Sequence, residues 1–242
     1  MITVVIPTYN EERNIEKCLI SLTKQNIPRD SFEIIVVDGN SKDRTAEIAS
    51  KYADRVIQQV SHGVGGARND GFMIASGDIV ATTDADCCPD EDWLHTIQTD
   101  FSDDQIVAVT GYLTPMIPKE MHRIEAGVYK YAFKVVNGLR NAGSKVGYYH
   151  LCGANTAFRR DSFIRVNGYS DLAYSDDVEI AKRLSQHGKM AMNGHIQVDY
   201  SIRRIQKLGI LKYTWMIMKN DFNVMLLGKK PTKGSYAKQS YN

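Results

Sequence analysis

Short apolar runs that each end in a polar turn are the feature that most constrains the fold of this chain. The runs are Ile2–Ile6, Phe32–Val37, Arg55–Val60, Ile79–Thr83 and Ile106–Thr110. Helix-like segments separate them, and this alternation is typical of βαβ units. The sequence therefore predicts an α/β fold: a Rossmann-like, mainly parallel sheet flanked by helices.

Local signals predict where the first helices begin. Asn10 is a candidate N-cap for a helix that starts at Glu11. Its apolar stripe comprises Ile15, Cys18, Leu19 and Leu22, at the spacing of one helix face. Ser41 or Asp43 is expected to cap a second helix, and residues 62–75 form a glycine-rich, helix-like segment.

Three polar turns follow three of the predicted strands: Pro7-Thr8-Tyr9-Asn10, Asp38-Gly39-Asn40 and Asp84-Ala85-Asp86. Parallel sheets bind ligands beyond the carboxyl ends of their strands. We therefore expect the three turns to meet at one edge of the sheet.

Asp84 and Asp86 are candidate ligands for Mg²⁺ or Mn²⁺. These cations prefer oxygen ligands and, beside phosphates, need only one or two protein carboxylates. An isolated Asp-x-Asp is also common in turns. The prediction of a metal site therefore depends largely on the two other polar turns.

The pattern changes after Pro115. Met121–Leu139 and Ser175–His187 resemble amphipathic helices, and Leu151–Arg160 and Ile196–Ile202 resemble strands. We expect residues 1–115 to form one half of a single domain, residues 116–204 a smaller second lobe, and residues 205–242 a C-terminal amphipathic helical tail.

The tail, together with Arg203 and Arg204 just before it, is strongly basic. Residues 203–242 contain nine Lys or Arg and one acid, Asp221, although the whole chain has a net charge of only +2. Because these cations alternate with apolar residues, a membrane surface is a better partner than nucleic acid. A helix that packs on the body and keeps its lysines in water explains the pattern equally well.

Composition favours a cytoplasmic protein, with a peripheral place on the cytoplasmic membrane face as the alternative. The four cysteines lack metal-site spacing and are expected to be reduced thiols. We find neither a signal peptide nor an apolar run long enough to span a bilayer.

Ordered motifs along residues 2–205 resemble glycosyltransferase family 2, whose members have the GT-A fold. The motifs are Val5–Glu11, Val36–Thr45, Gly65–Asn69, Asp84–Asp86, Cys152–Arg160 and Asp176–Glu179. The resemblance implies an inverting enzyme that uses a nucleotide-sugar donor.

The resemblance also implies roles for individual residues. The implied contacts with the nucleoside come from Pro7, Thr8, Tyr9 and Glu11. Asp38 would contact the base or a neighbouring ring, and Arg68 would approach the donor. Asp84 and Asp86 would contact the ribose and the metal-bound diphosphate. The family's Glu-Asp motif appears as Asp176-Asp177, so Asp177 is the expected general base. Helix capping by these two acids is the alternative.

Several residues keep two interpretations. Arg203 and Arg204 either bind the diphosphate or form a solvated or membrane-facing pair. Asn155 and Arg159 either shape the acceptor side or support the fold. His195 could complete a metal site, and His62 with its neighbouring glycines could approach the phosphates, although a surface histidine and a tight turn are the simpler explanations.

The sequence thus predicts metal-dependent transfer of one sugar from a UDP- or GDP-sugar to a lipid-linked or glycan acceptor. The Gln-x-x-Arg-Trp motif of the family's processive members is missing, which favours single additions. A nucleotidyltransferase and a non-catalytic nucleotide-sugar-binding protein remain alternatives.

Overall fold

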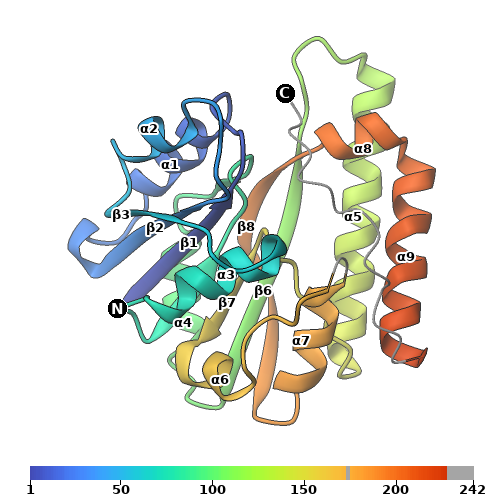
Figure 1. Ribbon diagram of the computed structural model, residues 1–242. Coiled ribbons are helices and arrows are strands. Elements are labelled where there is room, and N and C mark those ends of the chain that lie inside the picture. Colours follow the sequence, from blue (N-terminus) through green and yellow to red (C-terminus); the bar gives the residue numbers. More distant parts are fainter. Residues whose placement is uncertain (173–174, 228–242) are drawn as a thin grey trace.

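One eight-stranded sheet with helices on both faces forms the body of the protein (Figure 1). The structure is a computed structural model that describes residues 1–172 and 175–227. In spatial order the strands are β3 (Arg55–Gln58), β2 (Phe32–Asp38), β1 (Ile2–Thr8), β4 (Ile79–Thr82), β7 (Thr156–Arg159), β6 (Ile106–Met116), β8 (Lys189–Ser201) and β5 (Cys88–Pro89).

The helices lie between these strands along the chain. They are α1 (Ile15–Thr23), α2 (Thr45–Ala49), α3 (Gly63–Met73), α4 (Trp93–Asp100), α5 (Arg123–Lys145), α6 (Arg160–Arg165), α7 (Asp176–Leu184), α8 (Arg203–Leu208) and α9 (Ile210–Leu227), with a short 3₁₀ turn, η1 (Arg29–Ser31).

The sheet is parallel in its first half and mixed in its second. Strands β3, β2, β1 and β4 are mutually parallel, as the sequence predicts. Strand β7 then runs antiparallel to both β4 and β6, whereas β6 and β8 are parallel to each other. The four parallel strands of the first half bring their carboxyl ends to one edge.

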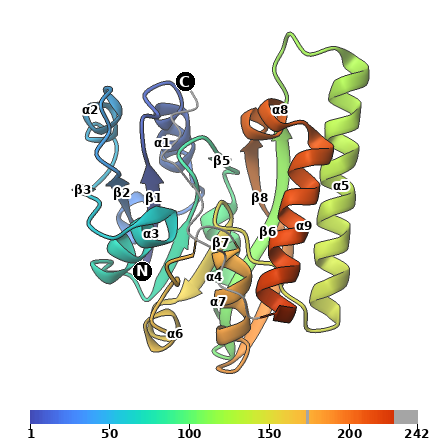
Figure 2. The same ribbon diagram turned by 45° about the vertical axis from the view of Figure 1, so that its right-hand side comes forward.

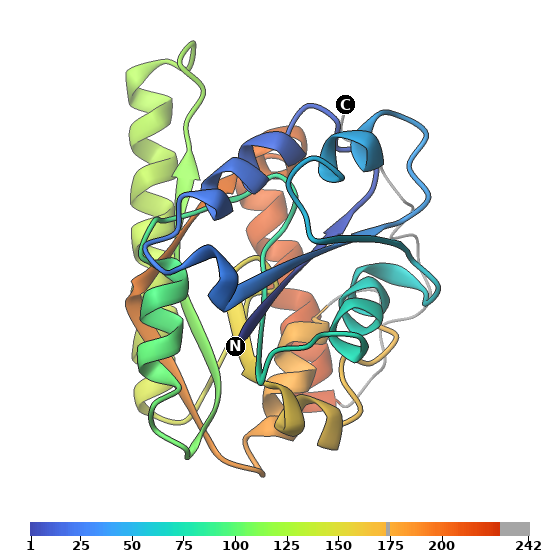
Figure 3. The same ribbon diagram turned by 90° about the vertical axis from the view of Figure 1, so that its left-hand side faces the viewer.

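Side-chain alternation along β1 separates two cores. Val4 and Ile6 face α1, α2 and α4, and Val5 faces α3, α6 and α7. Successive side chains of a strand point to opposite faces, so one buried strand serves both layers. Figure 3 shows the first face, with α1 (dark blue) and α4 (green) lying over the strands.

The first strand is longer than the sequence predicts, because it continues through Pro7 to Thr8. Strand β4 pairs only with Ile2–Val5, while pairing with β2 extends to Thr8. Pro7 therefore lies beyond the end of β4, where its missing N–H leaves no ladder bond unmade.

The first helix begins later than expected, at Ile15. Asn10 has a left-handed backbone (φ 52°), and its side chain accepts a hydrogen bond from the backbone N–H of Lys42 instead of capping α1. Asp43 does contact the start of α2, since it accepts from the N–H of Thr45.

Two strands of the second half also differ from expectation. The predicted strand Leu151–Arg160 contains only Thr156–Arg159, because residues 152–155 form a turn closed by the Asn155 N–H on the Cys152 carbonyl. The last long strand begins at Lys189, well before Ile196.

Helices α5, α8 and α9 form an outer layer beside the second half of the sheet (Figure 2). Tyr129 of α5 shares a buried cluster with Ile202 and Ile205, and Tyr213 of α9 packs against it. The predicted tail is thus helical and packed on the body as far as residue 227, and its remaining residues lie outside the described part. Among the described residues, no helix combines enough length and apolar character to cross a bilayer.

We predict opposite effects of two glycine-to-alanine substitutions within helices. A Cβ at Gly71 of α3 would lie 2.4 Å from Cγ1 of Val5, whereas one at Gly138 of α5 meets no heavy atom within 4 Å. Gly71→Ala should lower the free energy of unfolding by about 1–3 kcal/mol through overpacking. Gly138→Ala should raise it by about 0.5–1 kcal/mol through helix propensity. Urea unfolding measures both, and equal effects would contradict the packing of α3 on β1.

Candidate active site

Hydrogen bonds donated by backbone N–H groups join the turn after β1 to the segment after β2. The N–H of Gly39 donates to the Thr8 carbonyl at 2.8 Å, and the N–H of Asn10 donates to the Ser41 hydroxyl at 2.9 Å. The N–H of Glu11 donates to Thr45 Oγ1 at 2.7 Å. Two of the three predicted turns therefore form one continuous rim.

Asp38 lies within this rim, almost fully buried. Its carboxylate accepts hydrogen bonds from the backbone N–H and the hydroxyl of Ser41. Pro7 and Thr8 are buried beside it, and Tyr9 is partly exposed. The buried Thr8 hydroxyl has no hydrogen-bond partner within residues 1–172 and 175–227.

Arg203, the first residue of α8, connects the rim to the third turn. Its Nη2 lies 2.9 and 3.0 Å from the two carboxylate oxygens of Glu11 and 2.8 Å from Oδ2 of Asp86. Burial raises the pKa of Glu11, while the guanidinium opposes that shift. Arg204 lies apart from this bridge, near Tyr200 and Tyr213.

Arg68 occupies the centre of the site on α3 and is only 4% exposed. Its Nη2 donates to Asp84 Oδ1 at 2.8 Å, and its Nη1 lies 3.9 Å from Asp176 Oδ2. Its Cζ stands 5.6 Å from the centre of the Tyr169 ring. Burial alone would lower the pKa of Arg68, but Asp84 and the other acidic groups raise it, so the guanidinium stays charged.

Two glycines allow the close approach of these charged groups. A Cβ at Gly153 would lie 2.3 Å from the Arg68 guanidinium carbon, and one at Gly65 would lie 2.8 Å from Asp176 Oδ2. Any larger residue would push the ion pairs apart. Gly65 therefore serves helix packing beside Asp176, and His62, which is exposed and paired with Asp171, lies outside the cluster.

Asp176 and Asp177 open α7, as predicted. The Gly153 N–H donates to Asp177 Oδ2 at 3.0 Å. Within the described residues, Asp177 Oδ1 and Asp176 Oδ2 accept no hydrogen bond. Burial and the adjacent Asp176 carboxylate raise the pKa of Asp177 to about 7, although Arg68 opposes this.

The residue before this pair is held by α9, a contact that the sequence patterns did not reveal. Ser175 has a left-handed backbone (φ 58°), and its hydroxyl donates to Asp221 Oδ1 at 2.6 Å. His150 Nε2 lies 3.7 Å from the other oxygen of Asp221. The only available signal was that Asp221 is the single acid of a basic tail.

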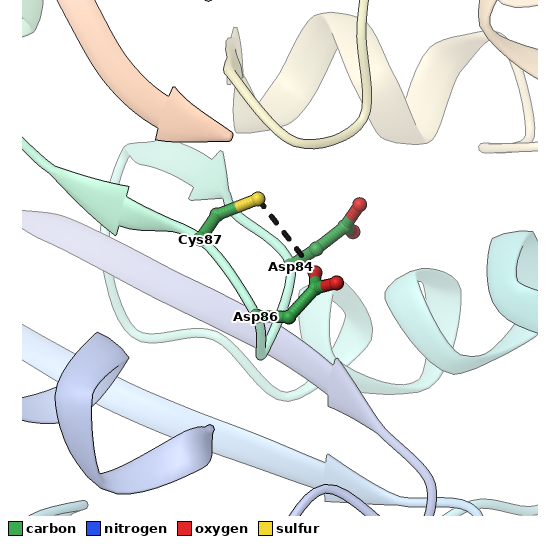
Figure 4. A group of neighbouring side chains, drawn as sticks. All are labelled: Asp84, Asp86 and Cys87. Atoms are coloured by element: carbon green, nitrogen blue, oxygen red, sulfur yellow. Dashed lines mark hydrogen bonds between the residues drawn. The ribbon is translucent and has the colours of Figure 1, made fainter. Parts of the chain in front are cut away.

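A group of possible metal ligands follows β4. Donor atoms of Asp84, Asp86 and Cys87 lie within 4.8 Å of one another, and Figure 4 shows the side chains projecting from one side of this turn. Burial raises the pKa of the Cys87 thiol well above its ordinary value, so it stays protonated and donates to Asp86 Oδ1. The two carboxylates that remain suit a hard cation such as Mg²⁺ or Mn²⁺.

Asn155 and Arg159 do not reach this site with free polar groups. The amide of Asn155 is fully buried and bonds to the Trp93 indole and to the carbonyls of Tyr112 and Ile196. Arg159 pairs with Ile79 at the opposite end of β4, and its guanidinium donates to the carbonyls of residues 101, 103 and 106. Their hydrogen bonds favour the second of the two interpretations that the sequence left open, in which both side chains support the fold.

His195 is also remote from the metal-ligand group. It is exposed and lies near Asp100 at the end of α4. The residues that the structure does bring together are the three turns, Arg68, the acidic pair and Arg203.

Solved structures share this fold. A mannosyltransferase from Pyrobaculum calidifontis, in complex with GDP-Man and Mn²⁺, has a TM-score of 0.66 at 24% identity, covering 93% of this chain and 68% of that chain. Staphylococcus aureus TarS, residues 1–349 in complex with UDP-GlcNAc, has a TM-score of 0.66 at 19% identity, covering 83% and 58%.

Sequence comparisons extend this likeness. Glycosyltransferase AglE of Haloferax volcanii is 40% identical over 99 residues, which are 38% of this chain and 33% of that protein. The first curated relatives are matched over less than half of their own length. The profile of "Glycosyl transferase family 2" matches residues 3–166, more than half of the sequence. The chain therefore belongs to glycosyltransferase family 2 and has a GT-A-like fold.

Proposed function

We propose that this enzyme transfers one sugar, with inversion, from a nucleoside-diphosphate sugar to a hydroxyl group of a lipid-linked or glycan acceptor. One observation carries the proposal: Asp177 holds an unpartnered carboxylate oxygen beside the Arg68–Asp84 pair. A base that is fixed through one oxygen and unpartnered through the other can accept a proton from an acceptor that reaches it.

The donor is proposed to bind along the rim in residues 1–115. The nucleoside meets Pro7, Thr8 and Tyr9, and the unpartnered Thr8 hydroxyl and buried Asp38 offer hydrogen bonds to base and ribose. Structural neighbours in complex with GDP-Man and with UDP-GlcNAc support either a guanine or a uracil donor.

The diphosphate is proposed to lie between Asp86 and Arg203. Asp84 and Asp86 would hold Mg²⁺ or Mn²⁺, which would neutralise charge on the departing diphosphate. Arg203 already contacts Asp86 and Glu11, so its guanidinium can turn to phosphate oxygens with little movement. Arg68 holds Asp84 and Asp176 in place by ion pairs, and through Asp84 it would position the donor. Arg204 is the weaker candidate, because it lies near Tyr200 and Tyr213.

The transfer itself is a single displacement. Asp177 Oδ1 takes the proton of the acceptor hydroxyl while that oxygen forms a bond to the anomeric carbon. The bond from this carbon to the diphosphate breaks, and the nucleoside diphosphate leaves with the electron pair. Attack from the face opposite the leaving group inverts the anomeric configuration.

The acceptor and location are also proposals. The basic, partly apolar tail supports an enzyme that works at the cytoplasmic membrane face on a lipid-linked acceptor, with the exposed Leu211 and Trp215 of α9 as contact points. A polyprenyl phosphate is already anionic and would need no base. Family membership argues against a nucleotidyltransferase, and release of nucleoside diphosphate from candidate donors distinguishes an active enzyme from a binding protein.

Donor and metal binding should depend on Asp86. In thermal shift assays with Mn²⁺, UDP or GDP should raise the melting temperature, since a ligand at a hundred times its Kd stabilises the folded state by about 2.7 kcal/mol. Asp86→Ala should abolish the part of the shift that requires Mn²⁺. The control Asp104→Ala removes an acid whose side chain is 99% exposed and remote from the rim, and should retain the full shift. An unchanged shift in Asp86→Ala would show that Asp86 does not bind the metal ion.

Catalysis should depend on ionised Asp177. Asp177→Asn should lower kcat by about 10²–10⁴-fold while the thermal shift with nucleotide is retained. In the wild type, kcat/KM should rise with pH and level off above about 7, because burial and Asp176 raise the pKa of Asp177 to about 7. Full activity of the Asn variant would point to a lipid-phosphate acceptor.

The same pKa predicts how stability changes with pH. The folded state binds a proton at Asp177 more tightly than the unfolded chain, whose Asp pKa is about 3.9. The contribution of Asp177 to the free energy of unfolding therefore falls as pH rises from about 4 to about 7. Asp177→Asn lacks this charge, so in urea titrations its stability relative to the wild type should increase as pH rises from about 4 to about 7. If the difference in free energy of unfolding between the variant and the wild type did not change with pH, the pKa of Asp177 would not be raised in the folded protein.

A further inference from the structure

Helix α5 carries two apolar faces, and only one of them is covered. Tyr129 and Phe133 point toward the cluster that contains Ile202 and Ile205, and Asn137 bonds to both backbone groups of Leu113 on β6. This inner face accounts for the packing of α5 on the body. It does not account for the apolar residues on the opposite side.

The second face is a stripe that runs the length of the helix. It comprises Ile124, Val128, Tyr131, Val135, Leu139 and, just past the helix end, Val146, which are 41–82% exposed. At about 100° per residue these positions fall within about 80° of one another, opposite the buried face. Within the described residues nothing covers the stripe. Continuous exposed apolar patches of this kind mark interaction sites.

The flank of the stripe shows which partner suits it. Arg123, Lys130, Lys134 and Lys145 are all exposed, and helical geometry places them together along one side of the stripe. Glu125 is the only acid of the helix. An apolar stripe bordered by cations is the pattern of a helix that lies in the surface of an anionic bilayer, where lysine stems reach along the apolar surface to the headgroups.

A second copy of this chain is a poorer occupant. Self-association through the stripe would bring two sets of four cations together with only one acid on each helix, and like charges across an interface are costly. An anionic lipid surface supplies the opposite charge instead, at roughly 1 kcal/mol for each Lys or Arg close to the membrane in general.

We propose that α5 is a membrane-docking helix, which inserts its stripe Ile124–Val146 into the surface of an anionic bilayer. The stripe lies one helix away from the active-site edge, because the inner face of α5 contacts Ile202 and Ile205, which flank Arg203 and Arg204. Docking therefore presents the second lobe to lipid-borne acceptors. The inference deepens the proposed lipid-linked acceptor, but the binding itself requires neither donor nor acceptor.

Vesicle co-sedimentation of the whole chain tests the docking helix. The wild type should bind phosphatidylcholine vesicles that contain phosphatidylglycerol, and less well at high salt. Tyr131→Gln/Leu139→Gln should weaken this binding about tenfold or more, since two apolar side chains no longer leave water. Lys130→Gln/Lys134→Gln should weaken it by about tenfold or more on anionic vesicles and leave binding to pure phosphatidylcholine unchanged.

Matched controls separate the helix from other surfaces. Val60→Gln, at a residue 91% exposed on the turn after β3, and Lys24→Gln/Lys51→Gln on the first half should bind like the wild type. Lys229→Gln/Lys230→Gln/Lys233→Gln tests the tail by itself and should retain most of the binding. Urea midpoints and nucleotide thermal shifts confirm that each variant is folded and binds donor.

Three outcomes would overturn the inference. One is equal vesicle binding by the wild type and the α5 variants; another is loss of binding only in the tail variant. The third is a dimer in analytical ultracentrifugation, without lipid, that the stripe variant converts to a monomer, because a second copy would then occupy the stripe. None of these results affects the proposed sugar transfer, which nucleoside diphosphate release measures independently.

Discussion

A single buried cation organises this site. Arg68 lies between Asp84, which follows β4, and Asp176, which opens α7, and the three residues come from distant parts of the chain. A guanidinium so deeply buried is tolerated only when carboxylates compensate its charge. Removing it would leave several carboxylates close together in a poorly hydrated space. The loop with Gly153 and the helix with Gly65 have no side chains at the points of closest approach, because the guanidinium and Asp176 occupy that volume.

Burial and an excess of carboxylates make the acids of this site hard to ionise. Asp84, Asp176 and Asp177 surround one guanidinium. Burial raises the pKa values of Asp176 and Asp177, and the neighbouring carboxylates raise them further. Arg203 balances Glu11 and Asp86 in the same way at the rim. A site of this kind is suited to a ligand that brings its own cation. Asp177 has no ion pair with Arg68, and its raised pKa allows it to exchange a proton near neutral pH.

The outer helices connect this electrostatic centre to the surface of the molecule. Asp221 of α9 holds Ser175, the residue before Asp176, and His150 beside it. Helix α5 packs against the segment that contains Arg203, and the same helix bears the exposed stripe. The proposed docking surface and the proposed donor site thus share one structural layer. This proximity gives a physical reason for an amphipathic helix whose outer face contributes nothing to the core.

The sequence by itself determined the alternating strands, the polar turns that end them, and the acidic pair at the start of α7. These features depend on local periodicity and on short motifs, and parallel strands bring their ends to one edge by geometry alone. A local signal also misled: Asn10 resembled an N-cap but took a left-handed conformation and accepts a hydrogen bond from the Lys42 N–H. For Asn155 and Arg159, the hydrogen bonds of the folded chain favour fold support, one of the two interpretations that the sequence left open. Only the tertiary structure decided that β7 runs antiparallel and that Arg203 bridges Glu11 and Asp86. It alone decided that Asp221 reaches Ser175, and that one face of α5 stays uncovered. These facts rest on contacts between residues far apart in the chain, whose burial and charge compensation no local pattern records.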